Sequence, residues 1–163
     1  MSTPSFDPFL ALRALLDHGV RFVVIGGFAA ALRGSPMITG DLDVCYARDD
    51  DNLERLAGAL RGLGARLRGA PANLPFQLDA RALEAGDHFT FATTAGPLDV
   101  LGTPAGTDGF VDLDASATDE DLDGVVVRVA SLEDLIRMKR AAGRRQDLIA
   151  VEWLSAIRDE LDR

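Results

Sequence analysis

Two aspartates separated by one residue, Asp41 and Asp43, stand in an otherwise apolar run. In an extended strand these two positions point to the same face, so their carboxylates are neighbours while Leu42 and Val44 enter the core. Two carboxylates held this close repel each other, and without a counter-charge one of them takes a raised pKa. Magnesium relieves such repulsion and prefers a few carboxylate oxygens together with substrate phosphates. The pair therefore predicts a site for a metal and a nucleotide.

A glycine pair, Gly26 and Gly27, precedes the aspartates and lies between an apolar run and an alanine-rich segment. Glycine adopts positive φ and lets backbone N–H groups approach a ligand. N–H groups at a helix N-terminus favour an anion, so the pair predicts a phosphate site beside the aspartates. The alternative is a tight strand-to-helix turn with close packing. Asp-x-Asp also occurs elsewhere in this acidic chain, but only Asp41 and Asp43 follow a strand, a glycine pair and a helix at short range.

A third carboxylate, Asp99, lies in a later apolar run between Leu98 and Val100. Nucleotidyl transfer at a two-metal site usually needs such a group. Asp99 is therefore the candidate to bridge a metal and to accept the proton of an attacking hydroxyl. The alternative is a solvated aspartate on an edge strand.

Charge and composition limit the class of protein. The formal net charge of the 163 residues is −9, which disfavours a surface for extended duplex nucleic acid. No apolar run could span a membrane, no signal peptide is indicated, and the single Cys45 excludes an internal disulfide framework. We therefore expect a cytoplasmic protein without membrane contact. A local anion site is still predicted by five basic residues within nine positions: Arg137, Lys139, Arg140, Arg144 and Arg145.

Strands and helices alternate along the chain, which predicts an α/β or α+β domain with one central sheet. Strands are expected over 20–25, 39–46 and 125–130, and two more within 88–103, joined around 95–97. Helices are expected over 8–19, 26–34, 52–64, 131–143 and 144–163. The stretch 71–86 has weak periodicity, and 103–124 is polar and predicts a short helix and a loop.

The final helix is amphipathic, and its predicted core-facing residues are Leu148, Val151, Leu154, Ile157 and Leu161. Trp153 is expected to pack in the core rather than to stack on a base. The whole chain, 1–163, is interpreted as one domain, with its core over about 5–105 and a C-terminal strand and helices over about 106–163.

Ile25-Gly26-Gly27 is followed by thirteen residues and then by Asp41-Leu42-Asp43-Val44. This arrangement resembles the signature of the minimal nucleotidyltransferases of the DNA-polymerase-β-like superfamily. The resemblance implies a mixed central sheet flanked by helices. It also implies that Gly26, Gly27 and Thr39 bind the nucleotide and that Asp41, Asp43 and Asp99 form a catalytic, metal-binding triad.

The segment from Ser131 to Leu154 is similar to a Lys-x-x-Ala-Gly-Arg-x-x-Asp stretch of small bacterial nucleotidyltransferases, some of which are abortive-infection toxins. Lys139, Arg144 and Asp147 match this pattern. Relatives often carry a basic residue where this chain has Met37, and Lys139 and Arg144 are candidates for that phosphate contact. The alternative is that their charges complement a helix C-terminus.

The implied function is magnesium-dependent transfer of a nucleoside monophosphate from a nucleoside triphosphate to an acceptor hydroxyl or phosphate, with one or two Mg²⁺ ions. The acceptor is a small molecule, a protein side chain or an RNA end. The alternative is a nucleotide-binding or inactive nucleotidyltransferase-like module that acts through a partner, such as one component of a toxin–antitoxin pair.

Overall fold

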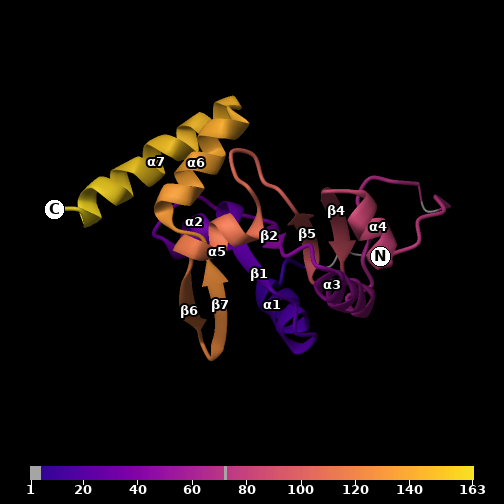
Figure 1. The fold of residues 1–163 in the computed structure, drawn as a ribbon. Helices are drawn as coiled ribbons and strands as arrows, with labels where there is room; N and C mark the ends of the chain where they lie inside the picture. The colour runs from indigo at the N-terminus through magenta and orange to yellow at the C-terminus, as the bar shows by residue number, and fades with distance from the viewer. Residues whose placement is uncertain (1–4, 72) are drawn as a thin grey trace.

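A seven-stranded mixed sheet organises the chain in a computed structural model that describes residues 5–71 and 73–163 (Figure 1). The strand order is β3-β4-β5-β2-β1-β7-β6. The strands are β1 Phe22–Ile25, β2 Leu42–Tyr46, β3 Arg66–Leu67, β4 His88–Thr93, β5 Gly96–Leu101, β6 Thr118–Leu122 and β7 Val125–Val129. The helices are α1 Pro8–Asp17, α2 Gly26–Leu32, α3 Asp50–Gly62, α4 Ala80–Ala85, α5 Phe110–Ser116, α6 Leu132–Ala142 and α7 Arg145–Leu161. The predicted mixed sheet with flanking helices and a helical C-terminal segment is confirmed.

The central strands fix the positions of the aspartates. Strand β2 runs antiparallel to β1, with Ile25 opposite Asp43. It runs parallel to β5, with Asp43 opposite Asp99. Because directly paired residues point to the same face, the register alone brings the side chains of Asp43 and Asp99 together.

The sheet is covered unevenly. On β4 and β5 burial alternates: Phe91, Leu98 and Val100 are fully buried on one face, whereas Thr90 and Asp99 on the other are only partly buried. Helix α3 packs against α1 and α4, and α6 packs against α7 at the end of the molecule where the C-terminus lies (Figure 1). Within the described residues, no helix combines the length and the apolar character needed to cross a bilayer.

Three elements differ from the sequence prediction. Helix α4 lies within the weakly periodic stretch 71–86, and strand β3 lies shortly before it. Segment β6 is a strand although its sequence, TDEDL, is almost wholly polar. The predicted burial of α7 is wrong in part: Trp153 is 48% exposed, Leu148 51% and Leu161 70%. The reason is that α7 packs mainly along α6, so only a narrow stripe around Leu154 reaches the core.

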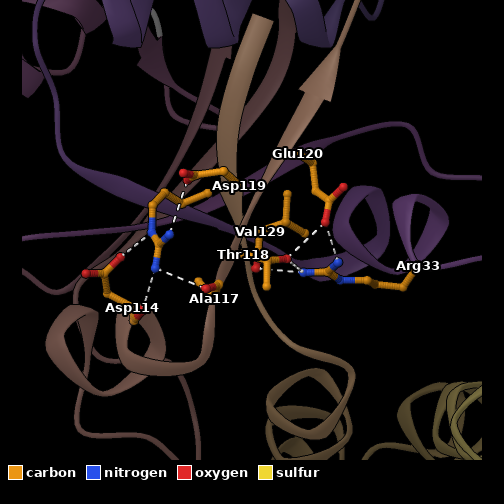
Figure 2. A network of polar contacts seen from close by, with 8 residues as sticks. Arg33, Asp114, Ala117, Thr118, Asp119, Glu120 and Val129 are labelled. Carbon is orange, nitrogen blue, oxygen red and sulfur yellow. Dashed lines mark hydrogen bonds and ion pairs between the residues drawn. The ribbon is translucent and has the colours of Figure 1, made fainter. Parts of the chain in front are cut away.

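Two arginines hold the polar strand β6 in place by binding side chains that alternate along it: Arg33 binds Thr118 and Glu120 (Figure 2), and Arg128 binds Asp119. Arg33, at the end of α2, donates to Glu120 Oε1 at 2.7 Å, to Thr118 Oγ1 at 2.7 Å, and to the carbonyls of Val129 and Ala130 at 2.9 and 3.1 Å. Arg128 donates to Asp114, Ala117 and Asp119. Because Arg33 also begins the connection to β2, it ties the β6–β7 hairpin to the segment that carries the aspartates.

Replacing Arg33 is expected to destabilise the fold more than replacing Arg128. The Arg33 side chain is 16% exposed, and Arg33→Met removes the guanidinium that donates to Glu120, Thr118 and two carbonyls, at a cost of about 2–3 kcal/mol. The more exposed Arg128 should cost about 1 kcal/mol in Arg128→Met. Urea denaturation measures both, with Arg13→Met on the exposed side of α1 as the control. Equal stability of Arg33→Met and Arg13→Met would contradict this role.

Candidate active site

Three carboxylates converge at one point of the sheet. Asp41 immediately precedes β2, Asp43 lies within β2, and Asp99 lies within β5. Each offers a carboxylate oxygen, and these oxygens lie within 4.8 Å of one another. No other three His, Cys, Asp or Glu side chains among the described residues come together in this way. The predicted convergence of the three aspartates is therefore present in the fold.

The electrostatics of this group favour a cation. Burial and, to a smaller extent, the negative charges of Asp41 and Asp99 together raise the pKa of Asp43 to about 7, while Lys139 opposes the shift. At neutral pH the group therefore retains a proton for part of the time. Three carboxylates that repel one another offer the oxygen ligands that a hard divalent cation such as magnesium prefers. The residues present fit such an ion.

The glycine pair leaves room for two site side chains. Gly26 has φ of +72°, and a Cβ there would overlap the Asp43 carboxylate. A Cβ on Gly27 would lie 2.9 Å from the Thr39 hydroxyl oxygen. Close packing, the alternative interpretation of this pair, therefore accounts for both glycines. Phosphate binding by the pair stays a prediction.

Thr39 contacts the aspartate pair directly. Its hydroxyl oxygen lies 3.1 Å from the Asp41 carbonyl oxygen and 3.3 Å from Asp41 Oδ1. A donor at this position restrains the connection between α2 and β2 and the orientation of the first carboxylate. Its contact with a nucleotide stays a prediction.

Lys139 and Arg144 meet on one buried carboxylate, Asp147. Arg144 Nε donates to Asp147 Oδ2 at 2.7 Å, Arg144 Nη2 donates to Oδ1 at 3.2 Å, and Lys139 Nζ lies 3.4 Å from Oδ1. The Asp147 side chain is 1% exposed, and its hydrogen bond from Arg144 is the main cause that lowers its pKa. Asp147 thus fixes both cations at the start of α7. The pattern Lys-x-x-Ala-Gly-Arg-x-x-Asp was the signal for this residue, but its geometric role was not predicted.

The basic cluster predicted from the sequence divides in the fold. Lys139 and Arg144 face the same pocket as the triad. Arg137 instead pairs with Asp112 and Asp134, at 3.0 Å in each case, on another side of α6. Arg140 and Arg145 are exposed and do not line this pocket. The anion site suggested by the five residues is therefore reduced to two of them.

One pocket of about 850 Å³ gathers the sequence-predicted site residues. Its wall also includes Met37 and Ile38, and the Ile38 side chain is fully exposed to solvent. Leu135, Met138 and Leu154 form an apolar part of the wall. The predicted residues on this wall are Gly26, Gly27, Thr39, Asp41, Asp43, Asp99, Lys139 and Arg144.

Sequence reasoning missed Arg68. Its Nη2 donates to Asp99 Oδ1 at 2.9 Å, so the third carboxylate already has a cationic partner from the edge of the sheet. The two-residue strand β3 that precedes Arg68 is too short to give a periodic signal.

The raised pKa of Asp43 predicts a pH dependence of stability in metal-free buffer. Between its ordinary pKa of 3.8 and the folded value of about 7, the folded state binds the proton that the unfolded state has lost. Stability conferred by this proton is therefore lost as pH rises through about 7. Asp43→Asn should remove that loss and raise the free energy of unfolding at about pH 8 by on the order of 2 kcal/mol. Thermal and urea denaturation across pH measure this, with Asp162→Asn, exposed at the end of α7, as the control. An unchanged pH slope in Asp43→Asn would show that Asp43 is ionised throughout.

Comparison with solved structures identifies the fold. No family model and no curated protein sequence matches the chain. Among solved structures, the lincosamide antibiotic adenylyltransferase LnuA, bound to lincomycin, aligns with a TM-score of 0.61 at 13% identity, over 92% of this chain and 95% of that chain. ANT(2'')-Ia, an antibiotic-resistance factor, aligns with a TM-score of 0.57 at 15% identity, over 95% and 89%. A candidate nucleotidyltransferase from Thermotoga maritima aligns with a TM-score of 0.53 at 18% identity, over 98% and 96%. The chain therefore has the fold of the small nucleotidyltransferases.

Proposed function

We propose that this protein is a metal-dependent nucleotidyltransferase. The observation that carries the proposal is the convergence of Asp41, Asp43 and Asp99 in one pocket with the two cations Lys139 and Arg144. A pocket with carboxylates on one wall and cations on another suits a triphosphate, whose charge needs both a metal and basic side chains. The shared fold with LnuA and ANT(2'')-Ia supports the same class of reaction.

In the proposed reaction, the oxygen of an acceptor hydroxyl attacks the α-phosphorus of the triphosphate. The bond between that phosphorus and the bridging oxygen breaks, and pyrophosphate leaves. Asp41, Asp43 and Asp99 would hold Mg²⁺, which when bound neutralises the carboxylates and the developing phosphate charge. Asp99 accepts the hydroxyl proton. Lys139 and Arg144, fixed by Asp147, bind phosphate oxygens through charge-assisted hydrogen bonds.

The acceptor stays open. The related solved structures hold lincomycin in LnuA and adenylyl-2''-tobramycin in ANT(2'')-Ia, so antibiotics are acceptors worth testing here. The protein and RNA acceptors expected from the sequence stay predictions, as do an antitoxin-like partner and a cytoplasmic location.

Transfer should depend on the aspartates. Pyrophosphate release from each ribonucleoside triphosphate is measured with Mg²⁺ in the presence of lincomycin, tobramycin or purified transfer RNA. Asp41→Asn should reduce release with any productive acceptor by at least about 100-fold, since it removes one metal ligand. Asp51→Asn, an exposed aspartate of α3, is the control and should leave the rate unchanged. Release by Asp41→Asn at the wild-type rate would contradict the proposed site.

Lys139→Ala tests the cationic wall separately. If Lys139 binds phosphate, its loss should weaken the affinity for a Mg²⁺–triphosphate complex by about 1.5–3 kcal/mol. If Lys139 only complements the end of α6, stability falls by about 0.3–1 kcal/mol and affinity is unchanged. Arg140→Ala is the matched control, because Arg140 is exposed on the same helix and lies outside the pocket wall. Isothermal titration at one salt concentration measures the affinities.

A further inference from the structure

Arg68 is anchored at three points on the edge of the sheet. Its backbone N–H donates to the Thr90 carbonyl at 2.9 Å, which extends the pairing of β3 with β4 by one residue. Its Nη1 donates to the Phe91 carbonyl at 3.2 Å, and its Nη2 donates to Asp99 Oδ1 at 2.9 Å. The two ends of the guanidinium therefore bind acceptors on two neighbouring strands. This arrangement fixes the plane of the group relative to the sheet.

The sheet register places Arg68 in line with the triad. Thr90 is opposite Asp99, and Asp99 is opposite Asp43. Arg68 continues this lateral row on the far side of Thr90, so Arg68, Thr90, Asp99 and Asp43 share one face. The row runs from the arginine near the edge of the sheet to Asp43 on the central strand β2. Thr90 is small enough for the arginine to reach across it.

The ion pair is sheltered on the side of Asp99. The Asp99 side chain is 13% exposed and that of Arg68 is 36% exposed. One oxygen of Asp99, Oδ1, is occupied by Arg68. Since Oδ1 is held from the outer side, the carboxylate cannot rotate freely about its last bond. Such rotation would otherwise carry its oxygens away from Asp41 and Asp43.

We propose that Arg68 is a positioning residue: it orients Asp99 so that this carboxylate completes the metal site with Asp41 and Asp43. The inference rests on the proposed function, because it concerns the metal that the nucleotidyl transfer would use. Ligating carboxylates are commonly held by an outer hydrogen-bonding partner, whose loss costs about 10–100-fold in metal affinity or activity. Arg68 supplies that partner here from the position directly after β3, and neither residue of β3 lines the pocket.

A competing effect of Arg68 would change the metal affinity in the opposite direction. A cation this close to Asp99 also repels a metal ion, so Arg68 could act as a stand-in for the metal that must leave before the ion binds. Removing the arginine would then tighten metal binding. The positioning role predicts weaker binding, so the sign of the change separates the two.

Mn²⁺ binding, followed by electron paramagnetic resonance and calorimetry at one pH and salt concentration, tests the proposal without an acceptor or a nucleotide. Arg68→Gln should weaken Mn²⁺ affinity by about 10–100-fold. Arg68→Lys keeps the positive charge but loses the paired guanidinium donors. Its Mn²⁺ affinity should therefore lie between that of Arg68→Gln and that of the wild type. Arg66→Gln is the matched control, because Arg66 lies two residues before Arg68 in the same extended segment, points to the same face, and forms no ion pair with any described residue. Its affinity should equal that of the wild type.

The outcomes are distinct. Mn²⁺ affinity in Arg68→Gln that equals or exceeds the wild-type value overturns the positioning role while leaving the proposed function intact. Wild-type protein that binds no Mn²⁺, or Asp41→Asn that binds it as tightly as the wild type, overturns the metal site and with it both proposals. Melting temperatures in metal-free buffer identify a variant that has lost its fold, and Arg68→Lys then carries the test: wild-type affinity in that variant shows that charge alone suffices and overturns the positioning role.

Discussion

The carboxylates of Asp41, Asp43 and Asp99 repel one another, and the surrounding structure must compensate for this repulsion. The pKa of Asp43 is raised to about 7, because burial and two neighbouring negative charges oppose its ionisation. Asp99 is bound by Arg68, and Lys139 lies close enough to favour the ionised form of Asp43. These responses reduce the repulsion without removing it. In the proposed function, a metal ion and a polyphosphate supply the remaining charge balance, and the relief of this repulsion contributes to their binding.

Backbone pairing, rather than side-chain contact, gives the site its geometry. The parallel pairing of β2 with β5 sets Asp43 beside Asp99, and the positive φ of Gly26 brings the start of α2 against Asp43. The cationic wall is built differently: Lys139 and Arg144 come from α6 and from the residue before α7, and the buried Asp147 holds them together. One wall is thus as rigid as the sheet, whereas the other depends on how α6 and α7 pack.

The sequence predicted those features that depend on residues close together in the chain. The alternation around Asp41 and Asp43 identified their common face, and Leu42 and Val44 are indeed fully buried behind them. The partner of Asp99 could not be predicted, because Arg68 follows a strand of two residues and its contact depends on the order of distant strands. Strand β6 was missed because its stability comes from remote arginines rather than from its own apolar residues. The exposure of Trp153 was missed because helical periodicity shows which residues share a face but not how far a neighbour covers it.

The acidity of β6 has a consequence for how the sheet behaves among copies of the same chain. An unpaired edge strand is a template for strand addition and aggregation, which proteins oppose with short or charged edges. One edge here, β3, has only two residues, and the other, β6, carries Asp119, Glu120 and Asp121 in succession. If β6 of a second molecule paired with this edge, the carboxylates of the two strands would lie close together and repel each other. The polar sequence, which makes this strand hard to predict, therefore also disfavours edge-to-edge association at high protein concentration.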